Sequence, residues 1–144
     1  MQINSSDLMS IRIAMFKSIK TSEENRNVIG QLTRKLNLGA ENIIARMAYT
    51  YSLSQDRKLD LKDLQDSRGK EYSRTVLFGD YDDIYLGLIC VHYNIYKTHK
   101  DLSKYIKLHV DDGLQLINKE ILKAPNIDGF DFLVELVAGR INEI

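Results

Sequence analysis

Basic side chains in the first third of the sequence could bind phosphate groups. Six of them stand at or before the second expected helix: Lys17, Lys20, Arg26, Arg34, Lys35 and Arg46. Phosphate binding requires Lys or Arg on one solvent-facing surface and needs no fixed spacing. An ordinary solvated surface would carry the same residue types, so type and spacing alone leave both interpretations open.

A second group of residues has the side chains of a metal-dependent phosphodiesterase. Such chemistry needs two or three carboxylates and a lysine that converge on a metal ion. The charge-rich segment and its end supply these types, as Asp60, Asp63, Asp66, Lys70 and Glu71. Charged loops often contain them by chance, so a nuclease is kept as an alternative.

Other signals of catalysis or metal binding are weak. The sequence has neither a glycine-rich phosphate loop nor a Gly-x-Ser-x-Gly turn. Cys90 lies in an apolar stretch, where an inert buried thiol is expected. His92, His99 and His109 lack the spacing of zinc ligands, and acidic residues 80–83 suit a helix start better than a calcium loop. We therefore expect no catalytic residue, no metal and no cofactor.

The zero net charge of the chain conceals an uneven distribution. The 144 residues include 20 Lys and Arg and 20 Asp and Glu. Residues 1–74 hold 13 basic and 9 acidic side chains, a balance of +4, whereas residues 75–144 hold 7 and 11, a balance of −4. The neutral total is a cancellation, and the basic first half favours a local contact surface for a polyanion.

The composition is that of a globular domain. The hydrophobic fraction is 44% and the charged fraction 28%, which excludes a disordered tail protein. A single cysteine fits a reducing compartment. No apolar run is long enough to cross a membrane, and the start lacks the pattern of a signal peptide. We expect one domain over residues 1–144, in the cytoplasm and without a membrane partner.

The sequence pattern predicts a strand followed by two helices as the elements that position the basic residues. Residues 11–21 fit either a strand or a helix face. Ser22 and the two Glu after it predict a helix start, and Gly39 predicts the left-handed residue that ends that helix. A second helix follows almost at once. This order is similar to that of ribbon-helix-helix DNA binders, in which paired strands enter a groove.

The remainder of the chain reads as amphipathic helices. One apolar stripe runs from Leu77 through Tyr81, Ile84 and Leu88 to Ile95, and a second runs from Leu102 to Ile117. A last short helix follows Pro125. The sequence therefore predicts a mainly α, compact domain of about five helices with a short N-terminal β-strand.

Several segments together resemble a known family. They are Ile19-Lys20-Thr21-Ser22, Leu32 through Leu38-Gly39, Asn42-Ile43-Ile44-Ala45-Arg46-Met47-Ala48, Ser52-Leu53 and, most specifically, Gly69-Lys70-Glu71-Tyr72-Ser73-Arg74-Thr75-Val76-Leu77-Phe78-Gly79-Asp80-Tyr81. In these the sequence resembles DndE, a small component of the bacterial DNA phosphorothioation machinery. The resemblance covers about residues 16–118. The segments before Phe16 and after Ala124 are longer than the family pattern and inherit no role.

The resemblance implies a function in DNA sulfur modification. In such systems sulfur replaces a non-bridging oxygen of the DNA backbone, and partner proteins of the same system carry out the sulfur chemistry. DndE-like proteins are helical, assemble as homo-oligomers such as tetramers, and bind double-stranded DNA, particularly nicked duplex, through a Lys-rich surface. A DNA-nicking activity has been proposed for some members, which keeps the nuclease alternative open.

The expected DNA contacts combine the basic cluster with two positions in the matched segments. They are Lys17, Lys20, Arg26, Arg34, Lys35, Arg46 and Lys70. Arg46 has a competing role, because it stands among apolar residues and could pair internally. A further alternative is a scaffold without DNA binding, in which Tyr93 and Tyr96 contact partner proteins. The uneven charge predicts that DNA binding depends on the oligomer and that an isolated subunit binds poorly.

Overall fold

The computed structural model describes residues 16–142 and confirms a mainly α fold. In chain order its elements are β1 (Ser18–Lys20), α2 (Glu23–Leu36), α3 (Glu41–Ser54), η1 (Leu61–Asp63), β2 (Glu71–Ser73), α4 (Arg74–Phe78), η2 (Gly79–Tyr81), α5 (Asp82–Tyr93), α6 (Leu102–Lys123) and α7 (Gly129–Asn142). Five of the described α-helices have 12 residues or more, as predicted. No helix within residues 16–142 is long and apolar enough to cross a membrane.

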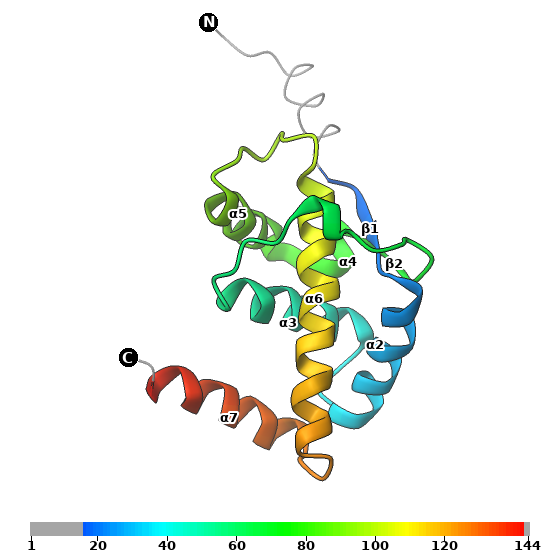
Figure 1. Cartoon of the computed structure of the whole chain (residues 1–144), viewed down its shortest axis with the longest axis vertical. Coiled ribbons are helices and arrows are strands. Elements are labelled where there is room, and N and C mark those ends of the chain that lie inside the picture. The colour runs from blue at the N-terminus through cyan, green and yellow to red at the C-terminus, as the bar shows by residue number, and fades with distance from the viewer. Residues whose placement is uncertain (1–15, 143–144) are drawn as a thin grey trace, which may run out of the picture.

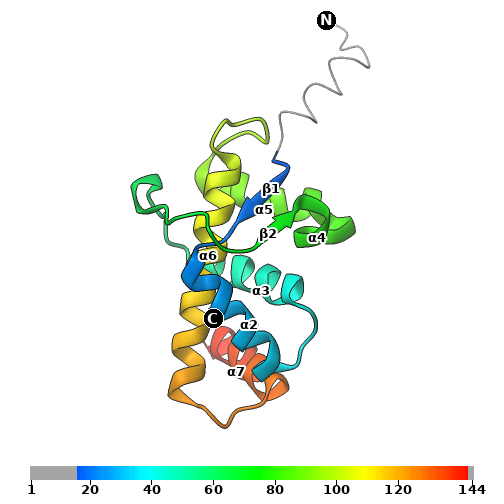
Figure 2. The same cartoon turned by 90° about the vertical axis from the view of Figure 1, so that its right-hand side faces the viewer.

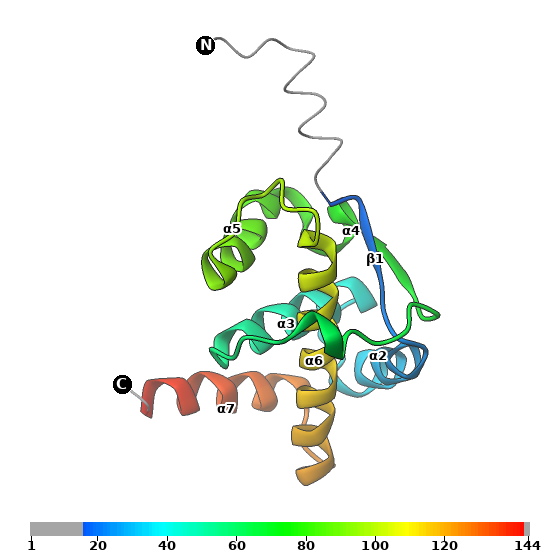
Figure 3. The same cartoon turned by 45° about the horizontal axis from the view of Figure 1, so that its top comes forward.

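The long helix α6 is the axis of the molecule (Figure 1). Its apolar stripe is buried as predicted, with Leu102, Ile106 and Ile117 at most 2% exposed. Helix α3 crosses it so closely that a Cβ at Gly113 would lie 1.8 Å from the carbonyl oxygen of Ala48. Figures 1 and 3 show α3 crossing α6 and α7 running away from the lower part of α6, with α5 on one side of α6 and α2 and β1 on the other. The core therefore forms around α6.

The predicted N-terminal strand pairs with a distant part of the same chain (Figure 2). β1 and β2 are antiparallel, with Ile19 opposite Tyr72 and Lys20 opposite Glu71. The buried pair Ile19 and Tyr72 anchors the ribbon, while Lys20 and Glu71 point outward. The strand–helix–helix order is thus present, and the strand completes its ribbon within the chain. Residues 11–15 of the ambiguous segment lie outside the described residues.

Helix α2 begins as predicted and ends differently. The Ser22 hydroxyl accepts a hydrogen bond from the backbone N–H of Asn25 over 3.1 Å, which caps the helix start. At the other end the left-handed residue is Asn37, with a φ of 51°, rather than Gly39. Asn tolerates this conformation better than most residues, so the helix stops two residues earlier than the glycine indicates. Gly39, with a φ of 139°, then starts the turn to α3.

The apolar stripe predicted from Leu77 to Ile95 is wrong in its middle. Gly79 has a φ of 63° and ends α4, so the helix that follows has a different phase. Leu86 and Ile89 consequently enter the core. Tyr81, Ile84 and Leu88 remain exposed. A helical period that is extended past the end of one helix into the next no longer marks a single face.

Candidate nucleic-acid interface

Three of the predicted DNA contacts line one open groove. It lies between the exposed side of α2, the start of α3 and the strand β2, and its volume is about 660 Å³. Arg26 and Arg34 stand on α2, and Lys70 directly precedes β2. The rest of the lining is polar or glycine: Asn27, Gly30, Gln31, Glu41, Gly69 and Glu71. Such a polar, solvent-exposed surface can bind the phosphate backbone of a nucleic acid.

The two arginines of this groove are available to an anion. Both side chains are exposed, and neither forms an ion pair with another described residue. Eight residues of helix separate them, which is about 12 Å along the helix axis. Gly30 lies between them and leaves the groove floor open, because it has no side chain. Phosphates at two separate points of a backbone could therefore be neutralised together.

Lys70 is held in place by its neighbours. A Cβ at Gly69 would lie 2.2 Å from the carbonyl oxygen of Ser22, so only glycine fits before it. The Lys70 N–H donates to Thr21 Oγ1 over 2.9 Å, and its Nζ pairs with the Glu41 carboxylate. Glu41 also accepts from the Tyr72 hydroxyl, and burial together with this carboxylate raises the pKa of Tyr72. Of the two acids that line the groove, Glu41 and Glu71, Lys70 therefore compensates the charge of Glu41.

Lys20 lines a second groove on the other side of the ribbon. This groove, of about 320 Å³, is formed by β1, residues 64–67 and the first turns of α6. Glu71 borders both grooves, so the two form one surface around β2. Lys104 stands in the second groove 3.4 Å from Asp101 and was missed by the sequence analysis. Its position in the sequence, among helical core residues, carries no signal that it lies beside β1.

The remaining predicted contacts lie elsewhere. Lys35 donates to the carbonyl oxygen of Pro125, beyond the end of α6. Arg46 donates from Nε to the carbonyl oxygen of Leu77 over 2.7 Å and lies 5.8 Å from the centre of the Tyr85 ring. Lys17 is exposed directly before β1 and lines neither groove. The fold therefore gathers Arg26, Arg34, Lys70 and Lys20 and separates the other three from them.

The carboxylates of the nuclease alternative have separate structural roles. Asp60 caps η1 by accepting from the N–H of Lys62, and Glu71 accepts from the Ser18 hydroxyl. Asp66 accepts from the N–H groups of Glu23 and Arg68, which lowers its pKa. Within residues 16–142 no group of three or more His, Cys, Asp or Glu side chains could hold a metal. The convergence that metal-dependent cleavage requires is not formed there.

Comparison with known proteins decides the family. The family model described as DNA sulphur modification protein DndE matches residues 18–123, well over half of the chain.

The chain belongs to the DndE family.

Solved DndE structures have the same fold. The crystal structure of DndE from Escherichia coli B7A, involved in DNA phosphorothioation modification, is 17% identical. It superposes with a TM-score of 0.59 over 72% of this chain and 98% of that one. The crystal structure of a DndE G21/24K mutant is 18% identical with a TM-score of 0.60 and the same coverage. No curated protein matches this chain. The family match ends at residue 123, so α7 lies outside it.

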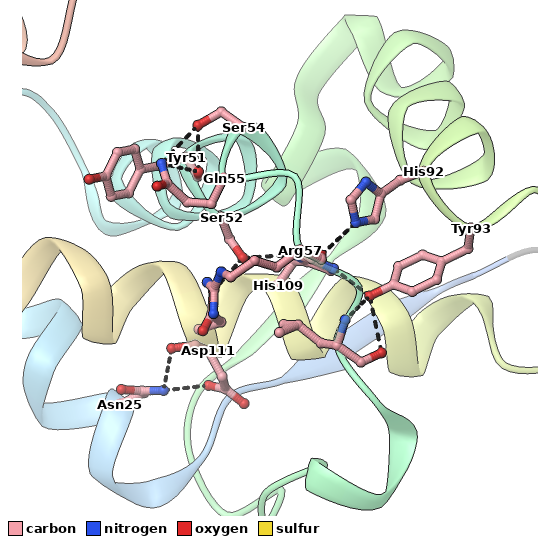
Figure 4. A network of polar contacts seen from close by, with 12 residues as sticks. Asn25, Tyr51, Ser52, Ser54, Gln55, Arg57, His92, Tyr93, His109 and Asp111 are labelled. Atoms are coloured by element: carbon pink, nitrogen blue, oxygen red, sulfur yellow. Dashed lines mark hydrogen bonds and ion pairs between the residues drawn. The ribbon is translucent and has the colours of Figure 1, made fainter. Parts of the chain in front are cut away.

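A buried polar cluster holds the DndE groove in shape. Asp111 of α6 is 3% exposed and accepts from the Asn25 amide over 2.7 Å and from the N–H of Ser22 over 3.1 Å. Its second oxygen pairs with Lys107 over 2.8 Å, and Lys107 also donates to the carbonyl oxygen of Asp66. Figure 4 shows the Asn25 amide pointing at Asp111. This cluster fixes the start of α2 and the loop at Asp66 to α6.

Arg46 provides a prediction that separates structure from DNA contact. Replacing Arg46 with Leu should lower the free energy of unfolding by about 1.5–3 kcal/mol, because the bond to a charged donor at Leu77 is lost. DNA affinity of the folded variant should stay unchanged, since the guanidinium already has its partners. Urea unfolding and a DNA titration check this prediction. The matched control is Arg34→Gln, which should lower DNA affinity and leave the free energy of unfolding unchanged. A variant of normal stability that loses DNA binding would contradict it.

A second network surrounds His109, which is fully buried (Figure 4). Its Nδ1 lies 2.8 Å from the Ser52 hydroxyl and its Nε2 lies 2.6 Å from the Tyr93 hydroxyl. Ser52 donates to the Asp112 carboxylate over 2.6 Å, so its oxygen can only accept from the Nδ1–H of His109. The single proton of the Tyr93 hydroxyl can go to Nε2 over 2.6 Å or to the carbonyl oxygen of Leu59 over 3.3 Å. When the shorter bond takes the proton, Nε2 accepts and His109 is neutral.

This network is structural rather than catalytic. In a nucleophilic triad the histidine stands between the serine and the acid, where it can take the serine proton. Here Ser52 stands between His109 and Asp112, and its side chain is fully buried. Tyr93 also accepts from the N–H of Leu59 over 2.9 Å, so the network ties the segment after α3 to α5 and α6.

The His109 network predicts a loss of stability in mild acid. Burial, helped by the nearby His92 and Arg57 and opposed by Asp112, lowers the pKa of His109 to about 4. Between about pH 6.5 and pH 4 the His109 imidazole is therefore protonated in the unfolded chain and stays neutral in the folded chain. The free energy of unfolding should fall by about 2–3 kcal/mol across this window and level off below it.

The measurement is urea unfolding at several pH values, compared with a His109→Gln variant. Gln lacks the titration, so its unfolding free energy should change less between pH 6.5 and pH 4. A wild-type chain and a variant with parallel pH curves would show that His109 does not carry the effect.

Proposed function

We propose that this chain is the DNA-binding component of a DNA phosphorothioation system and binds duplex DNA, nicked duplex in preference, as a homo-oligomer. The observation that carries the proposal is the groove in which Arg26 and Arg34 stand exposed without an ion pair to another described residue. Lys70 and Lys20 extend the basic surface around β2. Membership of a family of DNA sulphur modification proteins supports a nucleic acid as the anion.

The physical basis of binding is neutralisation of phosphates. Each phosphate contact releases condensed counterions, so affinity depends steeply on salt and little on sequence. One subunit offers only a few free cations, whereas a tetramer repeats the groove four times around a symmetric assembly. A nick lowers the cost of bending the duplex and so lets it follow such a surface. Acting on DNA with its partner proteins, the protein works in the cytoplasm.

The sulfur chemistry is assigned to partner proteins of the same system. Cys90 is the single cysteine of the chain, and burial raises the pKa of its thiol. A thiol with a raised pKa is a poor nucleophile, because the thiolate is the reactive form. This residue is therefore unsuited to carry sulfur to DNA.

Binding of matched nicked and intact duplexes over a salt series tests the proposal. We expect the association constant to fall linearly with salt on a log–log scale, with tighter binding to the nicked duplex at every concentration. Binding that is insensitive to salt would overturn phosphate neutralisation as the mechanism. Equal affinities would overturn only the preference for nicks.

A scaffold for the modification complex is the second candidate function. Tyr96, one of its two expected contacts, is 85% exposed and could bind a partner protein. The other, Tyr93, is held in the His109 network and stacks on Tyr105. Co-purification of an intact complex that does not retard DNA would favour the scaffold over the DNA-binding function.

A further inference from the structure

Helix α5, together with Tyr81 of η2 directly before it, carries an exposed apolar stripe on the side of the molecule away from the grooves. Tyr81, Ile84, Leu88 and Val91 are 69%, 62%, 43% and 83% exposed, and they follow one another at spacings of three, four and three residues. This is the spacing of the apolar seam by which two helices pack as a coiled coil. Solvent-facing helix positions are normally polar, so the stripe indicates a missing partner.

The stripe is complementary to a second copy of itself in the antiparallel sense. Residues 81 and 91, and residues 84 and 88, are symmetric about position 86. A two-fold axis at this point therefore sets Tyr81 against Val91 of the partner subunit, and Ile84 against Leu88 of the partner subunit. The large Tyr81 then faces the small Val91, and Ile84 faces Leu88 of equal size, so that the paired side chains can fill the space between the helices. Parallel pairing would instead set two Tyr81 side chains against each other.

Gly87 permits the close approach that this arrangement needs. It stands beside the axis, and a Cβ placed there would meet no other atom within 4 Å. The glycine is therefore not required by the packing of its own chain, and its absent side chain leaves the helix surface flat at the crossing point. A flat crossing point between apolar residues is suited to a facing helix.

The exposed area is that of an interface. Tyr81, Ile84, Leu88, Val91 and the neighbouring Tyr96 together expose on the order of 700 Å², close to the ~800 Å² that each partner of a standard interface contributes. The charged residues nearby, such as the pair Asp83 and Lys97, stand at the edge of the stripe. A polar rim around an apolar centre is the usual arrangement of interfaces.

We propose that two copies of the chain associate through α5, antiparallel and about a two-fold axis near residue 86. This deepens the homo-oligomer of the proposed function and rests on it. Figures 1 and 3 show α5 on the opposite side of α6 from α2 and β1. Association through α5 consequently leaves the groove at Arg26 and Arg34 of each copy open to DNA.

Sedimentation equilibrium of the full chain without DNA tests the surface. Leu88→Glu should raise the dissociation constant at least about tenfold, as expected when a central contact is lost and a charge is buried. The matched control is Val134→Glu on α7, which changes a side chain that is 50% exposed against 43% for Leu88. It should leave the dissociation constant unchanged. Unaltered helical circular dichroism in both variants confirms folding.

Disulfide trapping tests the antiparallel arrangement. In a Cys90→Ala background, Gly87→Cys should form a covalent dimer on mild oxidation, because the two copies of position 87 lie close together on either side of the axis. Val91→Cys should not, because residue 91 faces residue 81. The reverse pattern, or a wild-type chain that stays monomeric, would overturn the proposal. An oligomer that persists in Leu88→Glu would overturn the α5 interface and leave the proposed DNA-binding function intact. A dimer that forms through α5 but does not bind DNA would overturn the proposed function and leave the interface intact.

Discussion

Replacing Arg26, Arg34 and Lys70 together with Gln is expected to weaken binding of nicked duplex by on the order of 100-fold at ~0.15 M salt. Each neutralised phosphate contributes roughly 0.9 to the slope of log K against log salt, so loss of the two unpaired arginines should make the slope shallower by about 2 for each subunit in contact. In addition, Glu41 loses the Lys70 ammonium and repels phosphate from inside the groove. Titration of labelled duplex over a salt series measures both quantities.

The control for this variant removes a single positive charge from another surface. Lys123 stands at the end of α6, is 72% exposed and pairs only with Glu120 among the described acidic residues. Lys123→Gln should change affinity less than twofold and leave the salt slope unaltered. Arg26 and Arg34 are exposed, so the triple variant should unfold at nearly the wild-type urea concentration. Equal effects of the triple variant and of Lys123→Gln would refute the groove as the interface.

Replacing Asp111 with Ala is expected to lower the free energy of unfolding by about 3–5 kcal/mol. The variant leaves the Lys107 ammonium, only 6% exposed at its side chain, without its carboxylate. It also removes the acceptor of the Asn25 amide and of the N–H of Ser22. An unpaired buried charge costs far more than an exposed pair contributes, which explains the size of the effect. Urea unfolding monitored by circular dichroism measures it.

Two comparisons make the Asp111 result specific. Glu120→Ala breaks an exposed pair on the same helix and should cost at most about 0.5 kcal/mol. A double variant with Lys107→Met and Asp111→Leu removes both charges and should recover part of the loss. Because the cluster fixes the start of α2, Asp111→Ala should also weaken DNA binding at temperatures at which it stays folded. An unfolding free energy within about 1 kcal/mol of the wild type would show that the ion pair does not hold the fold.

Local signals predicted the helices well, because they act over a few residues. The cap at Ser22 and the apolar period of α6 are both read from neighbours in the chain. The prediction failed where one residue changed the phase. A left-handed conformation at Gly79 turned Ile84 and Leu88 outward, and periodicity alone could not show that the helix stops there.

The sequence predicted which types of residue form the candidate site, but it did not predict which of them lie next to one another in space. The predicted contacts came from a basic cluster and from two positions in the matched segments, Arg46 and Lys70. Exposed charges have no period in the sequence that reveals which of them are neighbours in space. Lys35 and Arg46 bind backbone carbonyl groups, which the sequence could not show because their partners are 90 and 31 residues away. Lys104 joins the surface from a third segment for the same reason.

By itself the sequence determined the mainly α fold, the short N-terminal strand and the membership of a DNA sulphur modification family, since local patterns and specific motifs carry these. Only the tertiary structure decided which charges share a surface. The pairing of β1 with β2 sets Lys20 opposite Glu71 across 51 residues of sequence, and the close contact at Gly69 aligns Lys70 with α2. Electrostatic contact depends on distance in space, and distance along the chain does not determine it.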